Sequence, residues 1–277
     1  MHPKTSADVQ AQYTLNDFLQ GRPEELRQAT QHPKILLTWL HGNEDLAPRV
    51  AQYLCTKRPD LLHHVDFICG NPQAVAHKEQ KGFIETDLNR SFNPKGLPKT
   101  YEEKRAAYLL ERIEKGGYEY VLDLHTSVSE VGCFIILEDR DPLPEAAQDL
   151  IACSPLTRVI LMPALVAYNT LIGTVPHSIV MEYQEGLVQE RGVKDVIFLL
   201  DGLIGHRGPL PATKREFFYV DGPILREHDP GLEARNFELC KDGYYPVLLG
   251  TGRFSYREDL TKPYVCFGAK RREVRLL

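Results

Sequence analysis

Short apolar runs alternate with amphipathic stretches over the first two thirds of the chain, and this alternation predicts an α/β fold. Apolar residues recur at helical spacing in 45–58, 100–115 and 144–153, and Thr100 with Glu103 gives the pattern of a capping box. The runs that we expect to form strands are 35–40, 65–69, 118–124, 132–137, 157–162 and 178–182.

After residue 208 the pattern changes to short β-type runs separated by Gly, Pro and Asp. We therefore expect an α/β domain at 1–208 and a small β domain at 209–277. The apolar face at 187–203 predicts the last helix of the first domain, with Gly205 near its end. The runs of the second domain are 217–220, 223–225, 237–239, 246–249 and 264–267.

The bulk composition is ordinary for a soluble globular protein. The 277 residues are 43% apolar and 26% charged, and the net charge of −5 gives no basic footprint for nucleic acid. No run approaches the roughly 18 apolar residues of a membrane span, and we expect no signal peptide because the N-terminus lacks a charged segment before an apolar core. Six scattered cysteines without a Cys-x-x-Cys pair indicate reduced thiols in a cytoplasmic protein.

His41 and Glu44 follow the first predicted strand, with Gly42 between them. Open α/β sheets place ligands outside the carboxyl ends of their strands, so the pair is a candidate for two ligands of a catalytic zinc. Alone the His-x-x-Glu pattern is weak, since ten histidines and an ordinary Glu content supply on the order of half a chance match per chain. The alternative is a surface histidine beside a solvated glutamate.

His125 follows the strand predicted at 118–124 and supplies a third candidate ligand. Because residues alternate between the faces of a strand, Asp123 and His125 share a face, where the carboxylate can orient the imidazole. Three N and O ligands with an open position for water define a catalytic zinc site. The alternative for His125 is a histidine at a strand end that hydrogen-bonds to a turn.

Three further polar residues are candidates for the chemistry around such a site. Glu182 ends the strand predicted at 178–182, and a carboxylate near zinc-bound water can act as general base. Its alternative role is an acid at the N-terminus of the next helix. Asn89 and Arg90 lie in an irregular polar stretch, where an Arg fork can hold a carboxylate through two hydrogen bonds. The alternative is a surface arginine paired with a neighbouring acid.

Together these stretches resemble the succinylglutamate desuccinylase/aspartoacylase family, zinc enzymes with a carboxypeptidase-like fold. The resemblance covers roughly residues 35–260, follows the family's order of motifs, and is strongest for the aspartoacylase branch. The motifs are His41-Gly42-Asn43-Glu44, Gly70-Asn71-Pro72, Asp87-Leu88-Asn89-Arg90-Ser91-Phe92, Asp123-Leu124-His125-Thr126, residues 132–139, the strand ending in Glu182, and Tyr245-Pro246-Val247 leading to Tyr256.

The resemblance implies one zinc ion per chain, held by His41, Glu44 and His125. It implies that Glu182 is the general base that activates water. The family reaction is hydrolysis of an N-acyl amino acid, which releases a carboxylate and a free amino acid. We therefore expect a small-molecule substrate and no nucleic-acid or membrane partner.

For the substrate, the resemblance implies that Asn89 and Arg90 hold the carboxylate of the amino acid. Tyr256 corresponds to the family's substrate-binding tyrosine after a one-residue shift in the alignment. Two family arginines are missing from this chain, because Gly82 and Ile172 stand at their positions. Lys81, beside Gly82, can supply a point charge to the scissile carbonyl but lacks the guanidinium fork. These departures argue against N-acetylaspartate as substrate and favour a less acidic acyl-amino acid.

The expected architecture is an α/β/α sandwich with a mixed central sheet, followed by the small β domain over the substrate site. Two other functions stay open at this stage. One is a metallocarboxypeptidase that acts on short peptides. The other is a catalytically weakened binding protein on the same scaffold, which the residues at 82 and 172 would favour. The sequence also leaves the oligomeric state open, a homo-oligomer included.

Overall fold

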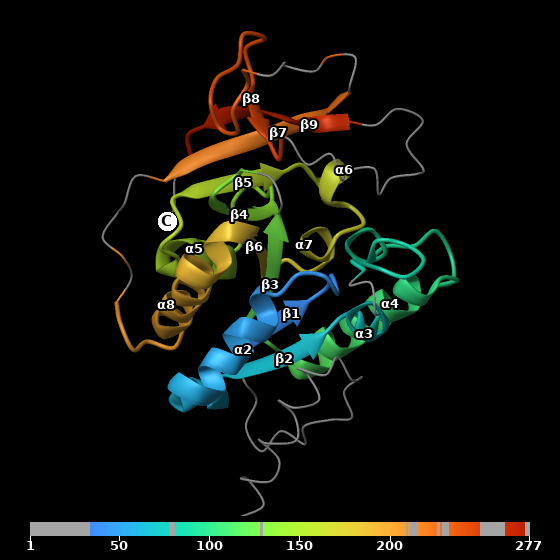
Figure 1. Cartoon of the computed structure of the whole chain (residues 1–277), viewed down its shortest axis with the longest axis vertical. Coiled ribbons are helices and arrows are strands. Elements are labelled where there is room, and N and C mark those ends of the chain that lie inside the picture. The colour runs from blue at the N-terminus through green and yellow to red at the C-terminus, as the bar shows by residue number, and fades with distance from the viewer. Residues whose placement is uncertain are drawn as a thin grey trace, which may run out of the picture. The chain divides into compact units, whose positions relative to one another are not determined.

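The computed structural model describes residues 34–77, 81–127, 130–208, 210, 215–225, 228, 233–249 and 264–274. It shows a mixed α/β protein with a large central sheet, as predicted (Figure 1). The chain divides into two compact units. Unit 1 is Met1–His125 with Asn169–Ser178, and unit 2 is Thr126–Tyr168 with Ile179–Leu277.

In unit 1, strand β1 (Ile35–Trp39) lies between β2 (Val65–Cys69) and β3 (Tyr120–Ser127), and both neighbours are parallel to it. Every residue of β1 is buried. Parallel strands covered on both faces have nearly continuous apolar sequences, which is why the runs at 35–40 and 65–69 predicted strands correctly. The register pairs Thr38 of β1 with Asp123 of β3.

Helix α4 (Tyr101–Gly116) has the predicted capping box. The Thr100 hydroxyl accepts a hydrogen bond from the Glu103 backbone N–H at 3.2 Å, and the Glu103 carboxylate accepts one from the Thr100 N–H at 3.0 Å. The residue after the helix, Gly117, caps its C-terminus with a left-handed φ of 62°. The buried face of α4 joins one apolar cluster with the sheet: Leu36, Leu40, Ile68, Leu88, Phe92, Ala106, Leu109, Ile113, Tyr118, Val121, Leu171 and Val175.

The remaining elements in the described part of unit 1 are helix α2 and four short helical segments. Helix α2 follows β1 and contacts it, close to the predicted range of 45–58. Four short elements lie in the connections between the longer ones. The bounds are α2 Leu46–Lys57, η1 Pro59–His63, α3 Pro72–Ala76, η2 Leu88–Arg90 and α7 Leu171–Thr174.

In unit 2 the strands run in the order β6-β4-β5-β7-β9-β8. The pairs β4/β5 and β5/β7 are parallel, while β4/β6, β7/β9 and β8/β9 are antiparallel, so the prediction of a mixed sheet is confirmed. Helices α5 and α8 pack against each other. The bounds are β4 Cys133–Glu138, α5 Glu145–Cys153, β5 Arg158–Met162, α6 Ala164–Ala167, β6 Ser178–Gln184, η3 Glu185–Leu187, η4 Val188–Gly192, α8 Val193–Leu203, β7 Glu216–Leu225, β8 Tyr245–Val247 and β9 Tyr264–Arg272.

The first strand after residue 208 continues the sheet of unit 2. Strand β7 is parallel to β5, with Phe217 opposite Val159, and β9 then pairs with β7. Within the described residues, the C-terminal strands therefore hydrogen-bond to the α/β part of the chain. The division of the chain at 208/209 stays a prediction.

Three local predictions were wrong in detail. The run 237–239 is a turn, because Phe237 adopts a left-handed φ of 63° and buries its ring against Phe134 and Phe218. The helix predicted over 187–203 begins as a 3₁₀ turn and a π-helical turn before α8. Both His125 and Glu182 lie inside strands, two residues before the ends of β3 and β6.

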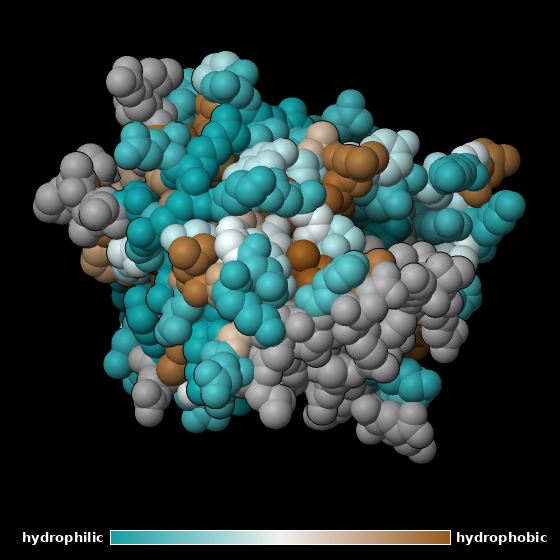
Figure 2. Space-filling view, turned by 90° about the horizontal axis from the view of Figure 1, so that it is seen from above, coloured by the Kyte–Doolittle hydropathy of each residue, from teal (hydrophilic) through white to brown (hydrophobic). Residues whose placement is uncertain are grey.

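Among the described residues, none of the helices has both the length and the apolar character needed to cross a bilayer. All six cysteines fall within these residues and are free thiols. In Figure 2, hydrophobic residues form small separate patches among hydrophilic ones on the coloured part of the face. Scattered apolar side chains of this kind are normal for a protein surface.

Candidate metal centre

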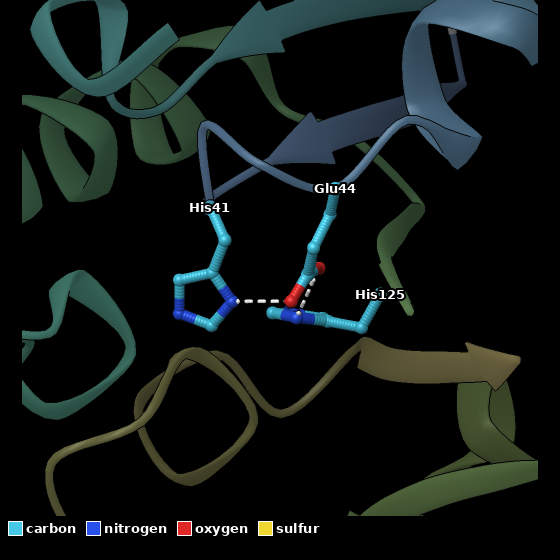
Figure 3. A group of neighbouring side chains, drawn as sticks. All are labelled: His41, Glu44 and His125. Carbon is cyan, nitrogen blue, oxygen red and sulfur yellow. Dashed lines mark hydrogen bonds and ion pairs between the residues drawn. The ribbon is translucent and has the colours of Figure 1, made fainter. Parts of the chain in front are cut away.

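The side chains of His41, Glu44 and His125 converge in unit 1 (Figure 3). The Glu44 carboxylate lies between the two rings, with Oε1 2.8 Å from His41 Nδ1 and Oε2 3.0 Å from His125 Nδ1. The rings meet edge to face with their centroids 4.8 Å apart. One potential ligand atom from each residue lies within 4.8 Å of the others. The structure therefore brings together the three residues that the sequence suggested as metal ligands.

The loop that carries His41 and Glu44 is held by close backbone contacts. It leaves β1 as a turn in which the Glu44 N–H donates to the His41 carbonyl at 3.2 Å. The Gly42 N–H donates to the Gly82 carbonyl at 3.1 Å. A Cβ at Gly42 would lie 2.4–2.7 Å from backbone atoms of Ala74 and Val75 in α3, so only glycine allows this approach.

Each histidine also has a carboxylate partner on its far nitrogen. His41 Nε2 lies 2.9 Å from Asp87 Oδ1, and His125 Nε2 lies 2.7 Å from Asp123 Oδ2. Carboxylates are acceptors, so these contacts place a proton on both Nε2 atoms and leave both Nδ1 lone pairs for a metal ion. Asp123 is in turn fixed by the Thr38 hydroxyl, which donates to Oδ1 at 2.7 Å.

The electrostatics of the group favour a cation. Burial alone would lower the pKa of His41, but the carboxylates of Glu44 and Asp87 outweigh it and raise this pKa to about 10. The pKa of His125 is raised well above its usual value by Asp123 and Glu44 in the same way. Burial would raise the pKa of Glu44, yet the two histidines lower it to about 2. The carboxylates thus favour positive charge beside the Glu44 carboxylate, and a divalent ion held by the two Nδ1 atoms and Glu44 would take the place of protons there.

The donor set fits zinc. Two imidazole nitrogens and one carboxylate oxygen are a known set for catalytic zinc, with bonds of about 2.0–2.2 Å and a fourth position open. A tetrahedral arrangement of such bonds separates the ligand atoms by roughly 3.3–3.5 Å. The two His–Glu contacts of 2.8 and 3.0 Å are slightly shorter than this, and all three residues offer ligand atoms within 4.8 Å of one another. Magnesium and calcium prefer all-oxygen sites, which this group does not offer. It is the one such group of three or more acids, histidines or cysteines found among the described residues.

Asn89 and Arg90 lie in a short 3₁₀ turn. Asp87 connects this turn to His41 of the candidate metal site. Asp87 Oδ1, the atom next to His41 Nε2, also accepts the Asn89 N–H at 2.8 Å. The Asn89 side-chain oxygen accepts the Leu171 N–H at 3.1 Å, which leaves its amide NH₂ as the donor. Within the described part of the chain, the Nε atom of Arg90 is buried without a hydrogen-bond partner. A buried unsatisfied cationic donor calls for an explanation, and a bound anion would provide one.

Three further residues were predicted for the site, and the structure does not test their roles. Glu182 is a mostly buried residue of β6 in unit 2, opposite Phe134 of β4. Lys81 is exposed in unit 1. Tyr256 lies outside the described residues. The roles assigned to these residues therefore stay predictions.

Both departures from the family pattern lie in unit 1. A Cβ at Gly82 would stand 3.1 Å from the Asn43 side-chain oxygen, so a larger residue there must displace Asn43. Ile172 is 5% exposed and follows Leu171, whose N–H binds Asn89.

The sequence did not reveal the role of Asp87 as the partner of His41. The two residues are 46 positions apart, and no periodic pattern links a loop residue to a strand end at that distance. The available signal was that Asp87 stands directly before Leu88-Asn89-Arg90, where an aspartate favours a cap. For His125, by contrast, strand alternation predicted its Asp123 partner correctly.

Comparison with known proteins supports the same family. The model of the succinylglutamate desuccinylase/aspartoacylase catalytic domain matches residues 35–174, about half of the chain. A probable aspartoacylase of Acaryochloris marina is 36% identical over 123 residues, and an aspartoacylase of Danio rerio is 36% identical over 117 residues. These alignments cover 39% and 37% of this chain, and they span only 39% and 36% of the length of the two relatives.

Solved structures with low sequence identity show the same fold. Murine aminoacylase 3 matches with a TM-score of 0.64 at 18% identity, over 91% of this chain and 98% of its own. The succinylglutamate desuccinylase from Chromobacterium violaceum matches with a TM-score of 0.66 at 18% identity, over 89% and 86% of the two chains.

Replacement of Asp123 by Asn tests the orientation of His125. The Asn side chain can present an NH₂ group to the Nε2 proton, so we expect zinc affinity to fall about 10–100-fold. The affinity is measured by competition with a chromogenic chelator. Asp45→Asn is the control, because Asp45 is exposed and pairs with Arg49. Equal affinity of Asp123→Asn and the parent would contradict the assigned role.

Gly42→Ala tests the close approach of the ligand loop to α3. The added methyl group meets backbone atoms that cannot rotate away, so we expect the free energy of unfolding to fall by about 1–3 kcal/mol. Gly186→Ala is the matched control, since no atom lies within 4 Å of its added Cβ. Denaturation in urea provides the comparison, and identical midpoints for the two variants would disprove the steric argument.

Proposed function

This chain belongs to the succinylglutamate desuccinylase/aspartoacylase family, and we propose that it is a zinc-dependent hydrolase of the amide bond in an N-acyl amino acid. The products are a carboxylate and a free amino acid. The observation that carries the proposal is the group of His41, Glu44 and His125, in which both histidines turn Nδ1 toward the Glu44 carboxylate. Asp87 links this group directly to the turn of Arg90, whose Nε has no hydrogen-bond partner among the described residues.

In this proposal, His41 and His125 would hold zinc through Nδ1, and Glu44 would hold it through its carboxylate. Bound zinc would supply a Lewis acid for the acyl carbonyl and lower the pKa of an attacking water. Asp87 and Asp123 keep the Nε2 protons in place, so the two rings stay in the tautomer that can coordinate metal.

Asn89 and Arg90 hold the carboxylate of the amino acid. The Nε atom of Arg90 has no partner among the residues that the structure describes, and a carboxylate would satisfy it together with other atoms of the guanidinium fork. The Asn89 NH₂ group is the second donor, because the Leu171 N–H fixes the amide orientation. A carboxylate held there would bring the neighbouring amide toward the metal group of the same unit.

Glu182 is the proposed general base. A carboxylate in this role takes a proton from the attacking water and then gives it to the leaving amide nitrogen, so the amine departs as a neutral group. The support is its position in the family pattern, as the acid near the end of the strand after the Asn89-Arg90 and His125 motifs.

The residues at 82 and 172 favour a substrate whose side chain is uncharged. Ile172 is an apolar, nearly buried side chain one residue from Leu171, which fixes Asn89. An isoleucine offers no partner for a second carboxylate, and burial of an unpaired charge costs several kcal/mol, on the order of 3–5. Lys81 is the proposed cation for the scissile carbonyl.

A substrate panel tests the reaction and its specificity together. Zinc-loaded protein is incubated with N-acetyl derivatives of leucine, methionine, glutamate and aspartate, with N-succinylglutamate, and with a dipeptide, and free amine is measured. We expect the leucine and methionine derivatives to react faster than N-acetylaspartate. Release of amine from the dipeptide alone would instead indicate a carboxypeptidase, and no release from any member would contradict the proposal.

The variant Glu182→Gln tests the assigned base. Gln has nearly the same shape but cannot accept the proton, so we expect activity to fall by a factor of about 10²–10⁴ while bound zinc is retained. Glu185→Gln is the control, because Glu185 is an exposed acid three residues later. Hydrolysis by Glu182→Gln at the parent rate would show that another group is the base.

A further inference from the structure

Glu102 is an acid with no exposed surface in the first turn of α4. Both carboxylate oxygens accept hydrogen bonds from outside the helix. Oε1 accepts from the Ile84 N–H at 2.7 Å and from the Asn71 side-chain amide at 3.2 Å. Oε2 accepts from the N–H groups of Glu85 and Thr86, each at 3.2 Å. Hydrogen bonds to a carboxylate are about twice as strong as those between neutral groups, so this acid fixes its surroundings firmly.

One set of these bonds fixes the chain immediately before Asp87. The three N–H groups belong to consecutive residues, 84–86, so the whole turn of backbone is attached to one side chain. Asp87 comes next and contacts both His41 Nε2 and the Asn89 N–H. Glu102 thereby fixes the position of the backbone that leads into Asp87, Asn89 and Arg90.

The remaining bond connects Glu102 to Asn71, the residue that caps helix α3. Asn71 donates to Glu102 through its NH₂ group and caps α3 through its oxygen, which accepts the Ala74 N–H at 3.2 Å. Helix α3 is the element whose backbone leaves no room for a side chain at Gly42. The buried Glu102 carboxylate thus connects two segments. One is helix α3, which packs against Gly42 in the loop of His41 and Glu44, and the other is the segment that carries Asp87, the partner of His41.

We propose that Glu102 is a positioning residue for the active site, which holds the Asn89-Arg90 turn and Asp87 in register with His41 without touching substrate. This inference rests on the proposed function for its kinetic consequence, but its structural part is independent of the reaction. The neighbouring Glu103 provides a contrast. It also accepts two backbone N–H groups, from Lys99 and Thr100, but these only begin the helix.

The test compares Glu102→Gln with Glu103→Gln. In Glu102→Gln, either orientation of the new amide turns an NH₂ group toward two N–H donors, so two bonds are lost without a change of shape. We expect KM for N-acetyl-L-leucine, or for the panel member that the parent hydrolyses fastest, to rise about tenfold with a smaller change in kcat. Glu103→Gln should keep the parental KM even if it lowers stability. Glu102→Asp, which retains two acceptor oxygens, should recover part of the loss.

Amide hydrogen exchange in the zinc-loaded proteins gives a readout that does not depend on activity. We expect the backbone amides of Ile84, Glu85 and Thr86 to exchange at least about tenfold faster in Glu102→Gln, and at the parental rate in Glu103→Gln. Parental KM and parental exchange in Glu102→Gln would overturn the proposal, as would equal effects of both variants on KM. If the parent hydrolyses no panel member, the proposed function fails, while exchange at 84–86 still decides whether Glu102 fixes this segment.

Discussion

The pairing of each histidine with a carboxylate is the interaction on which the proposed site depends. An imidazole can bind metal only through an unprotonated nitrogen, and the Asp87 and Asp123 contacts assign the protons of His41 and His125 to Nε2. If either aspartate moved, the ring could rotate or change tautomer, and Nδ1 would no longer point at Glu44. The geometry of the proposed metal centre therefore depends on the positions of Asp87 and Asp123.

The two acids are fixed in different ways. Asp123 belongs to β3, parallel to β1, and the register places it opposite Thr38, whose hydroxyl holds it. A sheet position of this kind is rigid, since the backbone on both sides is hydrogen-bonded. Asp87 lies outside the strands, in the connection between α3 and α4, where its carbonyl accepts the Arg90 N–H at 2.9 Å and the Ser91 hydroxyl at 2.8 Å. Its position depends on side chains that tie the connection down, and the buried carboxylate of Glu102 accepts the N–H groups directly before it.

The sequence correctly predicted the features that depend on regular spacing of residues along the chain. Apolar runs located the strands, the capping box located α4, and alternation along a strand placed Asp123 beside His125. It did not predict contacts made through irregular backbone, because Asp87 and His41 are 46 positions apart and neither spacing nor composition links them. For Phe237, the sequence predicted a regular element that the structure does not contain. Its apolar character predicted a strand, but the ring is buried from a turn with left-handed backbone.

Metal analysis of the purified protein tests the central claim most directly. The chain is expressed without added chelator, and bound zinc per chain is measured for the parent and for His41→Ala and His125→Ala. Our account predicts about one zinc per parent chain and little zinc in either variant, since each loses one of three protein ligands. A parent protein that binds no zinc even after incubation with the metal, or variants that bind as much as the parent, would contradict it.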